Sequence, residues 1–318
     1  MNTSDIRAIY EALRAESGKV LVGLDEPFEL LAVALFTGGH VLLEGVPGTA
    51  KTLMAKTLAH MVQAQFTRVQ FTPDLMPSDI LGTSVFDMNS SRFYLKKGPI
   101  FTQFLLADEI NRAPAKTQAA LLEAMEERQV NLDGERHELG KPFMVIATQN
   151  PIEYEGTYPL PEAQLDRFMF KILVSYSDIE HEIEIMRRYH LGFDAHDLAS
   201  AQLKPVLSAE QVMQIRQELR QVVVEEGILR YVAQINAASR QSPDIVLGAS
   251  ARAATHVLLA SKTLAAIQGR DFVIPDDVKT IVPPVYRHRI LLKPEAEIEG
   301  LDADAVIQRL LNQVEVPR

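Results

Sequence analysis

Short apolar runs alternate with helical patterns between about residue 40 and residue 176. Each run is apolar at nearly every position: Val41-Leu42-Leu43, Val69-Gln70-Phe71, Phe104-Leu105-Leu106-Ala107, Phe143-Met144-Val145-Ile146-Ala147 and Phe170-Lys171-Ile172-Leu173-Val174. Strands of this kind are covered on both faces. The pattern therefore predicts an α/β fold with a parallel sheet flanked by helices. Ligands of such sheets bind beyond the carboxyl ends of the strands.

After Tyr176, helical periodicity replaces the strand pattern. Ser208 and Gln211 form a capping box, and the apolar residues that follow share one helix face: Val212, Ile215, Leu219 and Val222. Ser250 opens another helix, which Gly269 can end. The second half of the chain is therefore predicted to be mainly α-helical.

Two more helices are expected near the C-terminus. One covers residues 276–282 and stops at Pro283-Pro284, and a last one follows Asp302. We divide the chain into an α/β core with an N-terminal helix, residues 1–177, and a smaller helical domain, residues 178–318. A length of 318 residues supports two domains, because single cores rarely keep growing beyond roughly 250–300 residues.

The composition excludes several classes of function. Hydrophobic residues make up 47% of the chain and charged residues 23%, as in ordinary globular proteins. The net charge of −10 disfavours wrapping of DNA or RNA, because Lys and Arg carry most of that affinity. There is no cysteine, which rules out disulfides, thiolate metal sites and cysteine nucleophiles. We therefore predict no nucleic-acid partner.

The N-terminal residues 1–14 have the pattern of an amphipathic helix. Its apolar face holds Ile6, Ile9, Tyr10 and Leu13, and the apolar run of a signal peptide is missing. No stretch of the sequence reaches the ~18 consecutive apolar residues that a membrane span needs. We expect a cytoplasmic protein with no integral membrane segment.

A glycine-rich loop follows the first predicted strand and precedes an apolar helix over residues 53–61. Its sequence is Gly45-Val46-Pro47-Gly48-Thr49-Ala50-Lys51-Thr52. Glycines let the backbone fold around an anion, so that N–H groups and the helix N-terminus face phosphates. Lys51 would reach the β- and γ-phosphates of ATP, and the Thr52 hydroxyl would bind Mg²⁺. The alternative is a Gly/Pro turn before a helix that happens to carry Lys-Thr.

Ala50 departs from this motif, because the usual residue before the lysine is glycine. The extra methyl is tolerable if the backbone at Ala50 is near-helical.

Acidic and amide side chains follow the next predicted strands. Asp108-Glu109 comes after residues 104–107, where one carboxylate can hold Mg²⁺ and the second can activate water. The alternative for this pair is a surface cap on a helix near Ala113. Asn150 follows residues 143–147 and would hold the attacking water or the γ-phosphate, although Asn before Pro is also a turn signal.

Two arginines complete the candidate site. Arg167 precedes the fifth strand and is a candidate arginine finger, a cation inserted into the neighbouring subunit's site. The alternative is an Asp166–Arg167 pair that caps a helix. Arg252 lies in the first turn of a helix, where a cation opposes the helix dipole, so we expect an anion such as a nucleotide phosphate to hold it. A surface arginine is the alternative.

Together these residues resemble the AAA+ ATPases, and most closely their MoxR family. The more specific signatures are Asp108-Glu109-Ile110-Asn111-Arg112-Ala113, Thr148-Gln149-Asn150-Pro151, residues 160–168 and residues 248–253. The resemblance covers roughly residues 19–294. It implies a three-layer P-loop core with a five-stranded sheet, an all-α lid, ATP and Mg²⁺ at their junction, and a homo-oligomeric ring, usually hexameric.

The resemblance also assigns roles that the residues alone do not. Val22-Gly23 would belong to the adenine pocket, and Arg112 would act at the subunit interface. Sequence cannot separate Arg112 from Arg167 as the main finger, and we favour Arg167. Whether Arg252 acts in its own subunit's site or in the adjacent one stays open.

Two hairpin-like stretches fit the same resemblance. Residues 82–98 would be an insert within the second core helix, and residues 130–142 would form a hairpin with Asp133-Gly134 as its turn. In related rings such hairpins face the partner or the pore.

The implied function is Mg²⁺-dependent ATP hydrolysis that drives a chaperone or remodelling motor. MoxR relatives typically serve a separate protein with a von Willebrand factor A domain, in its maturation or in metal or cofactor insertion. One alternative is a metal-chelatase-like motor subunit. Another is a nucleotide-gated binding regulator with negligible hydrolysis, which Ala50 would favour. The acidic composition disfavours a DNA-remodelling motor.

Overall fold

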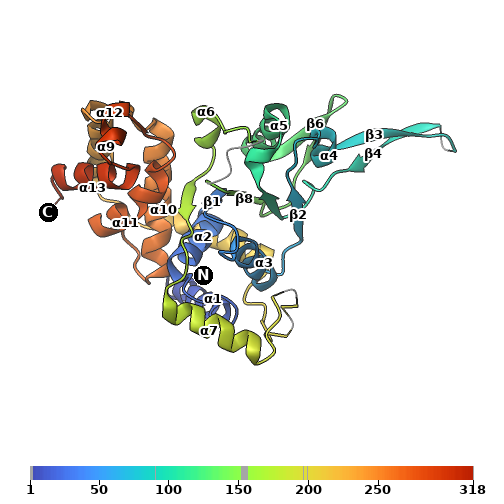
Figure 1. The fold of residues 1–318 in the computed structure, drawn as a ribbon, viewed down its shortest axis with the longest axis horizontal. Coiled ribbons are helices and arrows are strands. Elements are labelled where there is room, and N and C mark those ends of the chain that lie inside the picture. The colour runs from blue at the N-terminus through green and yellow to red at the C-terminus, as the bar shows by residue number, and fades with distance from the viewer. Residues whose placement is uncertain (1–2, 90, 152–156, 196, 199, 318) are drawn as a thin grey trace.

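A five-stranded parallel sheet forms the centre of the computed structural model, which describes residues 3–89, 91–151, 157–195, 197–198 and 200–317 (Figure 1). Its strand order is β2-β5-β8-β1-β9, and every neighbouring pair is parallel. The strands are β1 (Val41–Glu44), β2 (Phe66–Gln70), β5 (Phe104–Asp108), β8 (Met144–Gln149) and β9 (Phe170–Leu173). All five predicted strands are confirmed, although β2 begins and ends earlier than its apolar run indicated.

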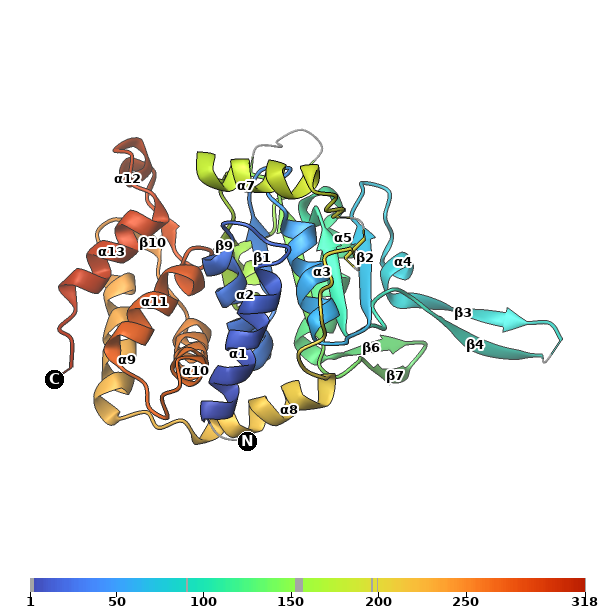
Figure 2. The same ribbon diagram turned by 90° about the horizontal axis from the view of Figure 1, so that it is seen from below.

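Successive residues of the strands enter different hydrophobic cores, as expected for a sheet buried on both faces. Val41 and Leu43 of β1 pack with α1 (Thr3–Ser17), α2 (Asp25–Thr37) and α3 (Lys51–Met61), whereas Leu42 packs with α5 (Ala115–Glu127). Figure 2 shows α1, α2 and α3 over one face of the sheet. The predicted three-layer α/β core is therefore confirmed.

The chain after β9 is mainly helical, and some of its elements contact α1 and α2 of the core. The helices are α7 (Ile179–His190), α8 (Ala209–Glu218), α9 (Glu226–Gln241), α10 (Ala251–Ile267), α11 (Pro275–Tyr286), α12 (Pro294–Ile298) and α13 (Ala303–Gln313), with the 3₁₀ turn η2 (Leu219–Gln221) and the short pair β10 (Ile245–Leu247) and β11 (Leu291–Leu292). Helices α9, α10, α11 and α13 pack on one another as the all-α lid, and α10 contacts α1 and α2. Helix α8 packs on α2 of the core instead.

Side-chain caps begin three of these helices where the sequence predicts them. Ser208 and Gln211 form the expected capping box of α8, with the Ser208 N–H donating to Gln211 at 2.8 Å. Ser250 accepts from the Ala253 N–H at 3.4 Å, and Asp302 accepts from the Ala305 N–H at 2.7 Å. The N-terminal helix is also present from Thr3, and residues 1 and 2 lie outside the described residues.

The predicted end of α11 at Pro283-Pro284 is wrong, because the helix continues through both prolines to Tyr286. Two prolines remove two backbone donors from the helix. However, Val285 and Tyr286 are fully buried in the lid core. Burial of the Val285 and Tyr286 side chains outweighs the lost hydrogen bonds. The prolines in the sequence do not reveal this gain, because it arises from packing in the folded protein.

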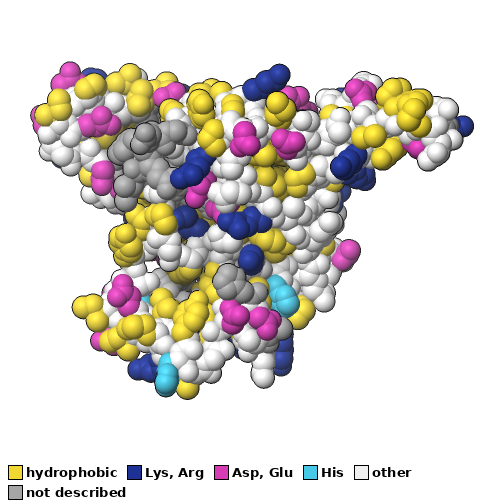
Figure 3. Space-filling view, turned by 45° about the vertical axis from the view of Figure 1, so that its right-hand side comes forward, with side chains coloured by type: hydrophobic (Ala, Val, Ile, Leu, Met, Phe, Trp, Pro, Cys, Tyr) yellow, Lys and Arg dark blue, Asp and Glu magenta, His cyan; other side chains and the backbone are white. Residues whose placement is uncertain are grey.

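Two antiparallel hairpins extend from the core. The first pairs β3 (Gly82–Asp87) with β4 (Arg92–Lys97) and follows α4 (Pro77–Leu81), so the second core helix is reduced to five residues. The second pairs β6 (Gln129–Leu132) with β7 (Glu135–Glu138) around the predicted Asp133-Gly134 turn. The first hairpin projects from the core with hydrophobic side chains on its surface, and Phe93 is 72% exposed (Figure 3).

No helix in the described part of the chain combines the length and the apolar character that a membrane crossing requires.

His40 is a buried imidazole that joins three elements of the core. Its Nδ1 accepts from the Val145 N–H of β8 at 2.9 Å, so the proton lies on Nε2, which donates to the Met125 carbonyl of α5 at 3.1 Å. Burial lowers the pKa of His40 to about 4. The fold therefore requires the neutral ring.

We predict that acid destabilises the fold through His40. In the unfolded chain this ring protonates near pH 6.5, but in the folded chain only near pH 4, so the unfolded state binds more protons between these values. Stability should be full above about pH 6.5 and fall by roughly 3 kcal/mol, from this group, as the pH drops to about 4. Urea unfolding from pH 7 to pH 4, compared with His40→Gln, measures this; equal pH slopes would contradict it.

Candidate functional site

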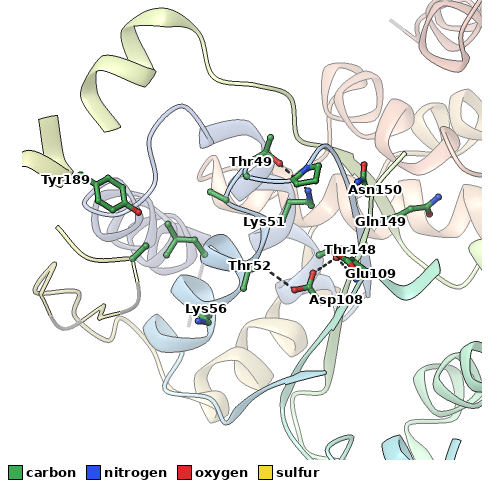
Figure 4. A pocket seen from close by; sticks show the side chains of 15 residues that line it. Thr49, Lys51, Thr52, Lys56, Asp108, Glu109, Thr148, Gln149, Asn150 and Tyr189 are labelled. Atoms are coloured by element: carbon green, nitrogen blue, oxygen red, sulfur yellow. Dashed lines mark hydrogen bonds between the residues drawn. The ribbon is translucent and has the colours of Figure 1, made fainter. Parts of the chain in front are cut away.

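The glycine-rich loop, residues 45–50, joins the end of β1 to the start of α3. A Cβ on Gly45 would lie 2.2 Å from the Val174 carbonyl oxygen, so only glycine allows this approach of the two backbones. Gly48 has φ +85°, a left-handed conformation that glycine adopts without strain. The loop lines a cavity of about 420 Å³, into which the ends of β5 and β8 also lead (Figure 4).

Ala50 does not have the near-helical backbone that would make its methyl harmless. It lies in the left-handed region with φ +59° and ψ +20°. A non-glycine residue there costs about 1–2 kcal/mol. The methyl packs against the hydrophobic core beside α3, which offsets part of this cost.

Lys51 is the first residue of α3, and its ammonium group lies inside the loop. It donates to the carbonyl oxygens of Gly45 and Val46, both at 2.7 Å, and to the Thr49 hydroxyl at 3.3 Å. Burial lowers the pKa of Lys51, and the carboxylates of Asp108 and Glu109 oppose this effect. The loop therefore encloses the positively charged ammonium group of Lys51.

Asp108 ends β5 and is the buried carboxylate of the site. One oxygen, Oδ1, accepts from the Thr148 hydroxyl at 2.6 Å. The other, Oδ2, lies 3.5 Å from the Thr52 hydroxyl and is 2.7 Å from a guanidinium nitrogen of Arg68 on β2. The carboxylate is thus oriented from three sides, with one oxygen directed toward α3.

Glu109 follows Asp108 in a left-handed conformation, with φ +56°. Its N–H donates to the Thr148 hydroxyl at 2.8 Å. Its carboxylate accepts from the Gln70 side-chain amide and from Arg112 in the 3₁₀ turn η1 (Ile110–Arg112), both at 2.9 Å. Strained backbone of this kind is often stored at functional sites, and here it turns the second acid into the cavity.

Asn150 follows β8 and lines the same cavity, so the predicted residues of the glycine-rich loop, β5 and β8 meet at one edge of the sheet. Figure 4 shows Lys51, Thr52, Asp108, Glu109 and Asn150 around this space. Gly45 and Val46 are the remaining members of the loop and bind Lys51 through their carbonyls.

A more apolar cavity of about 150 Å³ adjoins the loop. Val22 lines it, together with Tyr189 and Phe193 in and after α7. Gly23 is not part of its lining; a Cβ there would lie 2.8 Å from the His181 ring. The apolar walls and the neighbouring loop suit a flat heterocycle attached to phosphates.

Arg167 and Arg252 lie together at the other edge of the sheet. Both pair with Glu126 of α5, Arg167 at 3.0 Å and Arg252 at 2.6 Å. They line a separate cavity with His40 and Met169, which directly precede β1 and β9. In the parallel sheet this is the edge opposite the glycine-rich loop, so neither arginine reaches the loop of its own chain.

The donor set suits Mg²⁺ rather than a metal held by a complete protein cage. Within the described ranges, no three His, Cys, Asp or Glu side chains converge as a metal site. Thr52 and Asp108 offer one hydroxyl and one carboxylate, both hard oxygen ligands. Mg²⁺ typically uses one or two protein oxygens together with waters and substrate phosphates.

Several residues of the site were not predicted from the sequence. Arg68, Gln70 and Thr148 orient the two acids, and α7 covers the apolar cavity. The available signal was weak: Arg68 and Gln70 are polar residues two apart on one strand, and such pairs usually mark a solvated strand face.

Comparisons with known proteins agree with this fold and site. Residues 40–170 match a model of the ATPase family associated with various cellular activities (AAA), and residues 237–310 match the AAA lid domain. A crystal structure of a putative ATPase from Cytophaga hutchinsonii has a TM-score of 0.90 and 42% identity, and the match covers 99% of this chain and 97% of that one. The chain is thus an AAA+ P-loop protein with a helical lid.

Two relatives specify the family further. Chaperone MoxR1 of Mycobacterium tuberculosis is 43% identical over 98% of this chain and 82% of its own length. The uncharacterized protein YeaC of Bacillus subtilis is 43% identical over 94% of this chain and 92% of its own length. The chain belongs to the MoxR family of AAA+ ATPases.

We predict that Thr148→Val destabilises the fold by about 1–3 kcal/mol, because it leaves the Asp108 carboxylate and the Glu109 N–H without their buried partner. Thr57→Val is the matched control: Thr57 is equally buried, and its hydroxyl has no hydrogen-bond partner among the described residues. Replacing it should be neutral or stabilising. Urea unfolding of both variants measures the difference; equal losses at both positions would show that Thr148 has no such role.

Proposed function

We propose that this chain hydrolyses ATP with Mg²⁺ and uses the reaction to remodel a client protein. The observation that carries the proposal is the convergence of Lys51, Thr52 and Asp108 on one cavity at the carboxyl edge of the sheet. The glycine-rich loop, residues 45–52, would hold the phosphates through its main-chain N–H groups; Pro47 has no N–H and would only shape the turn, so the donors would be Gly45, Val46, Gly48, Thr49, Ala50, Lys51 and Thr52. The apolar cavity at Val22 would take the adenine.

The side chains around the phosphates have distinct roles in this proposal. Thr52 and Asp108 would hold Mg²⁺, which would supply charge neutralisation to the phosphates. Glu109 would orient and deprotonate the attacking water. Asn150 would keep that water or the γ-phosphate in line. Arg112 contacts Glu109 in its own chain, which favours a role in holding this acid rather than as the finger.

Arg167 and Arg252 would act on the nucleotide of a neighbouring copy. Their distance from the loop of their own chain, at the opposite edge of the sheet, supports this arrangement. A head-to-tail interface would bring this edge of one subunit to the loop edge of the next, and such interfaces close into rings. We propose a homo-oligomeric ring, hexameric as in related ATPases, with Arg167 as the finger.

The client would be a separate protein with a von Willebrand factor A domain. The projecting β3–β4 hairpin supports a client-binding role, since Phe86, Met88, Phe93 and Tyr94 are exposed on it. Exposed apolar groups of this kind often mark protein-interaction surfaces. Hydrolysis would shift the lid against the core, and the hairpin on the core would pass this movement to the client during its maturation or cofactor insertion.

We predict that Glu109→Gln lowers the ATP turnover number by about 100-fold or more, because the amide cannot accept a proton from water. Binding of Mg²⁺-ATP should persist, since the loop and Asp108 are unchanged. Lys51→Ala should instead lose binding. Steady-state phosphate release and calorimetry distinguish the two variants.

A Glu109→Gln chain that turns over ATP at the parental rate would contradict the proposal. Parental phosphate release no higher than that of Lys51→Ala would favour the nucleotide-gated regulator. The same Glu109→Gln ring, loaded with ATP, should retain a von Willebrand factor A domain protein in a pull-down, and retention of a chelatase partner would favour the metal-chelatase reading.

We predict that Lys51→Ala and Arg167→Ala subunits complement each other. Each variant alone should be nearly inactive, since one lacks the phosphate cation and the other lacks the finger. When equal amounts of the two variants mix at random in a ring, half of the subunits have an intact loop and half of their neighbours have an intact Arg167. About one interface in four then combines the two. Mixed samples should therefore recover ATP turnover in proportion to these interfaces.

Unmixed samples of each variant at the same total concentration are the control. If Arg167 served the site of its own chain, no subunit in the mixture would hold both groups, and turnover would stay at the level of the unmixed samples.

A further inference from the structure

Arg289 is a buried arginine at the junction of the lid and the core, just after α11. Its side chain is 1% exposed. Its Nε donates to the Asp166 carboxylate at 2.6 Å, and Nη2 donates to the Asp166 carbonyl at 2.9 Å and to the Phe168 carbonyl at 2.6 Å. Nη1 donates to the Met169 carbonyl at 3.1 Å and to the Val285 carbonyl of α11 at 2.6 Å.

Two histidines of the lid complete this contact. His288 Nε2 lies 3.0 Å from the Phe168 carbonyl, and His256 Nδ1 lies 2.8 Å from Arg289 Nη2 and must accept. Three carbonyls of residues 166–169 therefore bond to lid side chains instead of to a helix or a strand. This short segment carries Arg167 and leads into β9.

The free-energy cost of burying a charged group favours a specific role for Arg289 over simple filling of space. Burying a guanidinium is costly unless every N–H finds an acceptor. Here the planar group meets one carboxylate and several carbonyls, and bonds from a charged donor are roughly twice as strong as neutral ones. An apolar side chain of similar size would fill the space but would not fix the direction of the 166–169 backbone.

Asp166 extends the connection to Arg252. Its carboxylate also accepts from the Ser250 hydroxyl at 3.4 Å, and Arg252 lies 3.8 Å away. Arg252 and Arg167 in turn share Glu126. Arg289 is thus connected to Arg252 through the Asp166 carboxylate and to Arg167 through the carbonyls of the residues on either side of it.

We propose that Arg289 is a positioning residue that locks residues 166–169 to the lid, so that Arg167 and Arg252 are presented as one unit to the neighbouring subunit. A movement of the lid is then transmitted to Arg167. This inference rests on the proposed role of Arg167 as a finger, but the backbone lock itself does not.

The first test uses mixed rings in which Arg289 is altered on one side of the interface only. Lys51→Ala subunits that also carry Arg289→Lys donate the finger to Arg167→Ala subunits, and lysine lacks the planar fork of donors. Turnover should fall about tenfold or more below the mixture without Arg289→Lys, because a displacement of a catalytic group by 1 Å can cost ~100-fold. Moving Arg289→Lys to the Arg167→Ala subunit should leave the recovered turnover unchanged.

Arg287→Lys is the matched control. Arg287 also joins the lid to the core: it pairs with Asp304 of α13 within the lid at 2.7 Å and donates to the Lys171 carbonyl of β9 at 3.4 Å, and neither hydrogen bond goes to residues 166–169. Lys51→Ala subunits that also carry Arg287→Lys should restore the same turnover as Lys51→Ala subunits without it. The proposal would be overturned in favour of general destabilisation if turnover fell whichever of the two subunits carried Arg289→Lys. The same loss with Arg287→Lys would also overturn it.

The second test does not depend on ATP hydrolysis. Hydrogen exchange of the Arg167, Phe168 and Met169 amides should become about tenfold faster in Arg289→Lys, and also in Asp166→Asn, which keeps the side-chain volume. Amides of α3 should be unaffected. If exchange at residues 167–169 is unchanged in both variants, Arg289 does not hold this segment; if it rises while the parental mixture shows no complementation, the lock stands and the finger role fails.

Discussion

Burial of the central sheet on both faces is the constraint on which the rest of the structure depends. Leu42 and Leu43 point into different cores, and the same holds for Leu105 and Leu106. A charged side chain has no place in the middle of the inner strands β5, β8 and β1, because its desolvation would not be offset. Chemistry is therefore confined to the strand ends. The carboxyl ends carry the acids and the glycine-rich loop, and the opposite ends carry Arg167, just ahead of β9.

This separation makes a single chain incomplete under the proposed function. The phosphates would lie at one edge of the sheet, and the cations that neutralise charge in the transition state lie at the other. A head-to-tail contact between copies brings the two edges together without any change to the core. The lid then has two tasks. Arg252 on α10 lies directly at the edge of the sheet that holds Arg167, and Arg289 fixes the backbone that presents Arg167.

The sheet, the lid and the acids of the loop edge could be predicted because each has a local signal. Unbroken apolar runs mark the strands, and Asp108-Glu109 stands out because acids directly after a buried strand are costly. Arg68 and Thr148 gave no such signal, since their roles depend on pairing between β2, β5 and β8. The continuation of α11 through Pro283 likewise depends on burial of Tyr286, a long-range packing effect. The left-handed backbone of Ala50 is set by the loop as a whole.

The cations of both edges already have acceptors within the protein. Lys51 donates to two loop carbonyls, Arg68 pairs with Asp108, and Arg167 pairs with Glu126. Binding of a triphosphate must therefore exchange these partners for phosphate oxygens, and each exchange contributes only the difference between two bonds. Under the proposed function, Mg²⁺ at Asp108 would compete with Arg68 for this carboxylate, and the hydrogen bonds from Arg68 to Gln70 and from Gln70 to Glu109 would transmit the change to the second acid. Under the proposed function, binding of phosphates in the loop and release of the Glu109 carboxylate for its reaction are thus parts of one electrostatic rearrangement.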